Sequence, residues 1–128
     1  MKNKFTINYE LPTLNDYTKS NRANKYKGNS VKKKATDICS FLALQQHLSL
    51  EDCLYDVSIV WYQNNQRKDP DNIYFGVKFI LDGVVSAGIL PNDGQKNIRD
   101  ISHKIRRDKN SNYNYCIVEF IKVQSKEY

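Results

Sequence analysis

The sequence of 128 residues has few of the residues that usually indicate a disulfide framework, a zinc site or a membrane segment. Its three cysteines, Cys39, Cys53 and Cys116, lie far apart and form no C-x-x-C motif. Such a set argues against a disulfide framework and a zinc site and favours a reducing compartment, so we expect a cytoplasmic protein. No apolar run approaches the roughly 20 residues of a membrane helix, and the first residues lack the apolar core of a signal peptide, so we expect no membrane partner.

Histidine is also scarce. The chain has two, His47 and His103, and each stands apart from other metal-ligand residue types. We expect both to have structural or surface roles rather than to act as a ligand or a base. The pattern also indicates no small-molecule cofactor.

One stretch of the chain has no acidic residue. Residues 19–34 hold seven basic residues, which leaves 13 of the 20 basic residues to balance all 14 acidic ones elsewhere. Such a segment can neutralise phosphates, although a solvated lysine-rich helix face explains it equally well. With the basic residues just before the acidic motif described below, the candidate DNA-binding residues are Lys19, Arg22, Lys25, Lys27, Lys32, Lys33, Lys34, Arg67 and Lys68.

Length and composition predict one α+β domain that spans residues 1–128. Alternating apolar residues predict strands over 4–9, 54–63, 97–107 and 113–124, and helical spacing predicts helices over 14–23, 30–48 and 71–87. The order is β-α-α-β-α-β-β, with helices packed on a mixed sheet. We expect Thr13 or Asn15 to cap the first helix, a loop around Gly28, and a bulge between Ile98 and Ile101. The last strand is apolar on both faces and therefore suits the interior of the sheet.

Residues 67–95 contain the candidate catalytic residues. Asp69 and Asp71 are one residue apart, and a helical wheel that starts at Asp71 places Lys78 and Asp82 within about 20° of it on the polar face. Asp93 follows in a turn beyond the helix. Each acid has an ordinary explanation as an N-cap, a helix ion pair or a turn residue. Several acids and a lysine in one segment nevertheless indicate a site.

Three motifs resemble the RusA family of Holliday junction resolvases (crossover junction endodeoxyribonucleases), most closely its branch in phages and prophages of Gram-positive bacteria. They are Arg67-Lys-Asp-Pro-Asp-Asn-Ile, Lys78-Phe-Ile-Leu-Asp-Gly83 and Asn92-Asp-Gly-Gln95. Leu11-Pro12-Thr-Leu-Asn15 is similar to the N-terminal segment of that family. In the better-known members the lysine follows the second acid by one helical turn. This chain has Phe75 at that spacing, and Lys78 comes three residues later. The resemblance implies a RusA-like fold.

The resemblance also implies a Mg²⁺-dependent endodeoxyribonuclease, with Mn²⁺ as a substitute, that resolves four-way DNA junctions by paired symmetric nicks in recombination and repair. It implies a homodimer, metal binding by Asp69, Asp71 and Asp93, a catalytic role for Lys78, and a further acid at Asp82. Mg²⁺ prefers oxygen ligands, and a bound ion lowers the pKa of its water. Two alternatives stay open: a non-catalytic nucleic-acid-binding module, and a metal-dependent nuclease that acts on flaps or replication forks.

Overall fold

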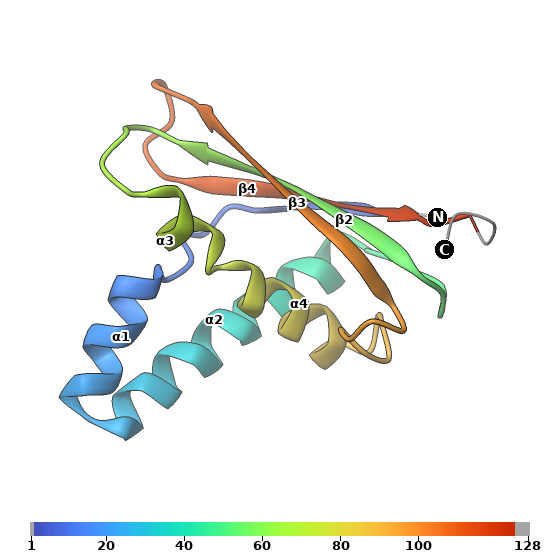
Figure 1. Cartoon of the computed structure of the whole chain (residues 1–128), viewed down its shortest axis with the longest axis horizontal. Coiled ribbons are helices and arrows are strands. Elements are labelled where there is room, and N and C mark those ends of the chain that lie inside the picture. The colour runs from blue at the N-terminus through green and yellow to red at the C-terminus, as the bar shows by residue number, and fades with distance from the viewer. Residues whose placement is uncertain (1, 125–128) are drawn as a thin grey trace.

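The computed structural model describes residues 2–124, which form a four-stranded mixed sheet with helices on one face (Figure 1). The predicted class, a single α+β domain with helices packed on a mixed sheet, is confirmed. In chain order the elements are β1 (Lys4–Ile7), α1 (Leu14–Ala23), α2 (Lys25–Gln45), β2 (Tyr55–Gln63), α3 (Pro70–Tyr74), α4 (Val77–Ser86), β3 (Ile98–Arg107) and β4 (Tyr115–Lys122). β1 and β4 are shorter than predicted. Among these residues, no helix is both long and apolar enough to cross a membrane.

The strands lie in the order β1-β4-β2-β3. β4 is antiparallel to both of its neighbours, whereas β3 is parallel to β2. The interior position predicted for the last strand is therefore confirmed. Tyr55 pairs with Ile98 and Val57 pairs with Ile101, so β3 has one extra residue at the predicted bulge. Parallel strands need a crossover connection, and α3 and α4 provide it.

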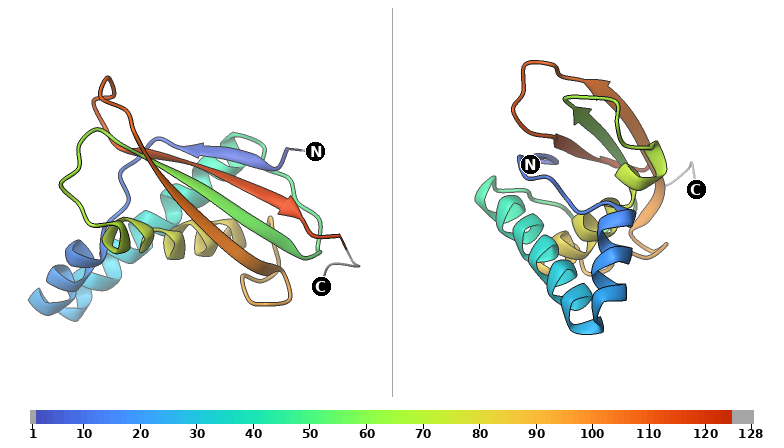
Figure 2. Two further views of the ribbon diagram at one scale, coloured as in Figure 1. Left: turned by 45° about the horizontal axis from the view of Figure 1, so that its top comes forward. Right: turned by 90° about the vertical axis from the view of Figure 1, so that its left-hand side faces the viewer.

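The hydrophobic core lies between the sheet and the helices, because the helices cover only one face of the sheet (Figure 2). Alternate strand residues point into it, as the two-residue period of a strand requires. The opposite face carries the half-exposed side chains of Ser58, Val60 and Tyr62. The largest fully buried side chains include Phe5, Ile7, Val57, Ile59, Phe79, Ile80, Val84, Val118 and Phe120.

The predicted single helix over 71–87 is wrong. A turn at Phe75 and Gly76 separates α3 from α4, so the order is β-α-α-β-α-α-β-β. A Cβ at Gly76 would lie 2.9 Å from Cη2 of Trp61, so the glycine lets the turn approach the sheet closely. The helical wheel placed Asp71, Lys78 and Asp82 on one polar face by assuming an unbroken helix with steps of about 100° per residue. Because Asp71 lies in α3 and the other two lie in α4, that assumption does not hold.

The predicted loop before the second helix is also wrong. α2 begins at Lys25, where the Asn24 side chain accepts a hydrogen bond of 2.6 Å from the Lys27 N–H. Gly28 is buried within α2, where the two helices pack closely. A Cβ at this position would lie only 2.6 Å from Oδ1 of Asn21 in α1, which explains the glycine. The basic residues 32–34 therefore lie within α2, well beyond its first turn, and not at the start of a helix.

Helical spacing also misplaced one side chain of α2. Helical spacing predicts that Ile38, Leu42 and either Leu44 or Gln45 lie on the inner side of this helix. However, Leu44 is 53% exposed, and Gln45 is exposed as well. Leu42 and Ala43 are buried instead, and Ile38 packs against the core. The α2 surface that faces away from the core is thus partly apolar.

Gly83 lies where α4 comes closest to α2. A Cβ there would lie 2.6 Å from the Cys39 Cβ, and 2.9 Å from both the Ser40 N and the Thr36 carbonyl O. Two of these atoms belong to a helix backbone and cannot move aside cheaply. We therefore expect Gly83→Ala to lower the free energy of unfolding by about 1–3 kcal/mol, the usual cost of overpacking. Urea denaturation measures it.

Gly94→Ala is the matched control for this prediction. A Cβ at Gly94 would come within 3 Å only of the Asn92 Oδ1, at 2.9 Å, and that side chain can turn away. Its free energy of unfolding should stay within about 0.5 kcal/mol of wild type, as for most surface changes. Equal stability of the two variants would contradict the close contact between α2 and α4.

Candidate functional site

Two exposed carboxylates lie where β2 leads into α3. Asp69 is the N-cap residue of α3, but its side chain makes no capping hydrogen bond, so the N-cap explanation for this acid does not hold. Asp71 lies in the first turn of α3. Within residues 2–124, neither carboxylate has an ion pair, and neither accepts a hydrogen bond. Both are therefore open to a ligand from solvent.

The N-terminal motif and the acidic motif meet in space. The backbone N–H of Asn15 donates a hydrogen bond of 3.1 Å to Oδ1 of Asn72, the residue after the second acid. The rings of Tyr17 and Phe75 lie 5.7 Å apart and reinforce this contact. Thr13, one of the two expected caps, caps α1 through a reciprocal pair of hydrogen bonds with the next acid along the helix. The start of α1 thus holds α3 in place.

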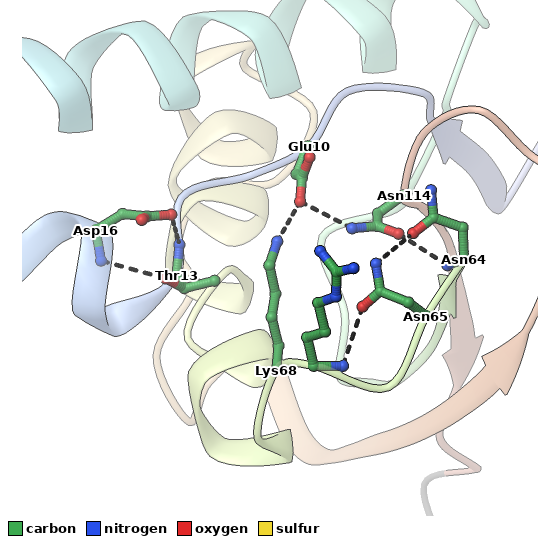
Figure 3. Close-up of polar contacts among 8 residues, drawn as sticks. Glu10, Thr13, Asp16, Asn64, Asn65, Lys68 and Asn114 are labelled. Atoms are coloured by element: carbon green, nitrogen blue, oxygen red, sulfur yellow. Dashed lines mark hydrogen bonds and ion pairs between the residues drawn. The ribbon is translucent and has the colours of Figure 1, made fainter.

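A polar network fixes the connection that precedes the acids (Figure 3). The Glu10 carboxylate accepts hydrogen bonds from Nζ of Lys68 and, at 2.8 Å, from Nδ2 of Asn114. Oδ1 of Asn114 in turn accepts the Asn64 N–H at 3.0 Å. Burial raises the pKa of the Glu10 carboxyl, but the hydrogen bonds from Lys68 and Asn114 outweigh it, so the pKa lies below its ordinary value.

Sequence reasoning missed Glu10 and Asn114. The two residues are 104 positions apart, so no local pattern connects them. Asn114 is a buried polar residue just before β4, and its burial becomes apparent only in the folded chain. Lys68, a predicted DNA-binding residue, is therefore also an ion-pair partner of Glu10.

The third predicted metal ligand lies elsewhere. Asp93 belongs to the connection between α4 and β3, whereas Asp69 and Asp71 lie before α4. α4 has 10 residues and is therefore about 15 Å long. Among residues 2–124, no three His, Cys, Asp or Glu side chains form a group that could hold a metal ion. A single chain does not bring the three predicted acids together.

The chemistry of the remaining pair still suits magnesium. Mg²⁺ is commonly bound through one or two carboxylates together with phosphates of the substrate, and it keeps several waters. Asp69 and Asp71 supply two such carboxylates without other protein partners in the described part of the chain. Two acids from one copy therefore fit this ion, and a set of three acids within one copy does not.

Lys78 and Asp82 form an ion pair on α4. Nζ of Lys78 lies 3.8 Å from Oδ2 of Asp82, one helical turn away, and the lysine side chain is 53% exposed. Exposed pairs of this kind contribute only about 0.3–0.5 kcal/mol. No hydrogen bond or ion pair links Lys78 to Asp71 in the described range.

The predicted DNA-binding residues fall into two places. The basic residues of the segment 19–34 lie on the hairpin of α1 and α2, whose tip points away from the sheet (Figure 1). One of them, Lys33, pairs with Asp37 at 3.2 Å. Arg67 and Lys68, in contrast, lie in the connection that ends at Asp69.

His103 joins α3 to the sheet. Its Nδ1 accepts a hydrogen bond of 2.9 Å from the Trp61 Nε1–H, and the Tyr74 ring of α3 stacks on the imidazole with centroids 4.3 Å apart. Burial lowers the pKa of His103 below its ordinary value. This histidine has the structural role expected of it, because it anchors the helix that carries Asp71.

Comparisons with known proteins assign no family. The chain matches no family model, and no curated protein matches it. The site is therefore defined by its own residues: two open carboxylates, a basic connection before them, and contacts that hold both against α1 and the sheet.

The lowered pKa of His103 predicts a pH dependence of stability. The unfolded state binds the proton first as the pH falls, because its histidine has the higher pKa. The stability contributed by neutral His103 is complete above a pH of about 6.5 and is lost as the pH falls through the lower folded pKa. Urea denaturation from pH 7.5 to 5.5 should show this decline, and it should be smaller in His103→Asn.

His47→Asn serves as the control. His47 is exposed just beyond α2, at a backbone φ of 60° that asparagine tolerates. This variant should keep the full decline in stability toward low pH. An undiminished decline in His103→Asn would show that the titrating group is another residue.

Proposed function

We propose that this chain is a Mg²⁺-dependent, structure-specific endodeoxyribonuclease that resolves four-way DNA junctions, in DNA recombination and repair. The observation that carries the proposal is the pair Asp69 and Asp71, two exposed carboxylates that have no protein partner within residues 2–124 and directly follow a basic connection. Phosphodiester hydrolysis needs both a metal-binding group and cations for the flanking phosphates. The resemblance of residues 67–95 to RusA resolvases supports the same class of substrate.

In this proposal Asp69 and Asp71 hold the ion, with Mn²⁺ as a substitute for Mg²⁺. A bound Mg²⁺ supplies a water of lowered pKa and offsets negative charge on the phosphate. The protein backbone positions the two acids. Pro70 restricts the backbone between them, and the contact of Asn72 with α1 holds α3 in place.

Lys78 has the proposed role of a cation for the scissile phosphate or the leaving oxygen. Its present partner is Asp82, at 3.8 Å. Because an exposed pair of this kind is weak, the lysine can exchange its partner for a phosphate at little cost. Asp82 then keeps the side chain extended along α4 in the absence of DNA.

A homodimer is part of the proposal. A four-way junction is close to two-fold symmetric and needs two matched cuts, which an isologous dimer with two sites can make. Phe41 and Leu44 of α2, which packs against α4, are 60% and 53% exposed and offer an apolar contact surface. A second copy can then supply Asp93 to Asp69 and Asp71, which a single chain keeps apart.

We also propose a cytoplasmic location, which suits three free cysteines.

Cleavage of a labelled mobile four-way junction tests the function. Wild type should make symmetric paired nicks in Mg²⁺ and none in EDTA. Asp71→Asn removes a ligand charge but little volume, so it should keep junction affinity in Ca²⁺ while cleavage falls by about two orders of magnitude or more. Asp37→Asn removes the same charge from the exposed surface of α2 and should cleave as wild type does.

Each other outcome has a definite meaning. Undiminished nicking by Asp71→Asn would reject the site. Cleavage confined to flaps or replication forks would identify the related nuclease instead of a resolvase. Binding of the junction with no cleavage in Mg²⁺ or Mn²⁺ would identify a non-catalytic DNA-binding module.

A further inference from the structure

A basic groove lies beside the two carboxylates, and its two arginines, Arg106 and Arg107, belong to no motif that the sequence singled out. It opens between the connection from β2 to α3 and the last residues of β3, and its volume is about 340 Å³. Among residues 2–124, none that lines the groove is acidic. Three of them carry positive charge and three carry amides: Lys68, Arg106, Arg107, Gln63, Asn65 and Gln66.

Each of the two arginines of this groove uses one N–H donor within residues 2–124. Arg106 is exposed, and its guanidinium donates to the carbonyl of the preceding residue, Ile105, at 2.9 Å. Arg107 donates from Nε to the Asn64 carbonyl at 3.2 Å, which joins the two walls of the groove. In the described part of the chain, neither arginine has an ion pair with a carboxylate. Guanidinium groups with free N–H donors match the oxygens of a phosphate.

The facing wall is held in shape before any ligand arrives. The Asn65 side chain accepts the Arg67 N–H at 3.0 Å and donates to Oδ1 of Asn64 at 3.0 Å. Lys68 is tied to Glu10, which offsets part of its charge. Arg106 and Arg107 therefore supply most of the uncompensated positive charge, and a preorganised wall loses little entropy when it binds.

We propose that this groove binds a phosphodiester of the DNA backbone, with Arg106 and Arg107 as its main ligands. Pro70 lines the groove and stands between Asp69 and Asp71, so a strand in the groove passes beside both acids. Two carboxylates alone repel a polyanion, and the two guanidinium groups offset that repulsion. The inference rests on the proposed function for the choice of DNA, and it assigns a strand-positioning role to the end of β3.

Binding of a fluorescent four-way junction in Ca²⁺, over a series of NaCl concentrations, tests the groove. Each phosphate contact contributes about 0.9 to the slope of log K against log salt for duplex DNA. The double variant Arg106→Gln/Arg107→Gln should bind more weakly, with a slope smaller by about 0.9, because both arginines hold the same phosphate. Arg106→Lys/Arg107→Lys should keep most of the slope, which separates loss of charge from loss of fold.

Lys104→Gln/Lys109→Gln is the charge-matched control, because these exposed lysines lie in β3 and just after it but do not line the groove. An unchanged slope in the arginine variant, or an equal fall in the lysine control, would overturn the groove. Junction binding without Mg²⁺-dependent cleavage by wild type would reject the nuclease function. The salt slopes would still show whether the groove binds a phosphate of the DNA backbone. No binding by wild type would reject both.

Discussion

The parallel pairing of β2 with β3 is the constraint on which the rest of the structure depends. Two adjacent parallel strands end at the same edge of a sheet, so the chain must cross a face of the sheet between them. α3 and α4 make this crossing and bury their apolar sides against the sheet. The pairing also brings the end of β3 beside the connection that leads into α3, which creates the basic groove. Acids and arginines thus become neighbours although more than 30 residues separate them.

The same crossover separates the acids of the motif. Asp69 and Asp71 precede α4 and Asp93 follows it, so the length of the helix lies between them. Three carboxylates gathered without a metal would repel one another, and a monomer that keeps them apart avoids that cost. Under the proposed function, association of two copies would complete the site. Cleavage activity would then require the dimer, as the two matched cuts in a junction also do.

Local patterns predicted the features that local chemistry determines. Two-residue alternation located all four strands, and the apolar faces of β4 predicted its interior place. The break between α3 and α4 could not be predicted, because apolar helical spacing continues through it and the reason for Gly76 is a distant tryptophan in β2. Gly28 suggested a loop from the sequence, but the reason for this glycine is its close contact with Asn21 of α1. Two features could not be predicted because they depend on which strands pair: the contact between Glu10 and Asn114, and the arginine groove. The residues of each feature come from distant parts of the sequence, so no short stretch of it indicates them.

Mixing of subunits tests most directly whether each site takes Asp69 and Asp71 from one copy and Asp93 from another. Asp71→Asn and Asp93→Asn should each be inactive alone. In a heterodimer of the two variants, one site carries both changes and the other carries neither. Co-refolded mixtures should therefore regain Mg²⁺-dependent nicking of a four-way junction, as single unpaired nicks. A mixture as inactive as its separate components would contradict the shared site.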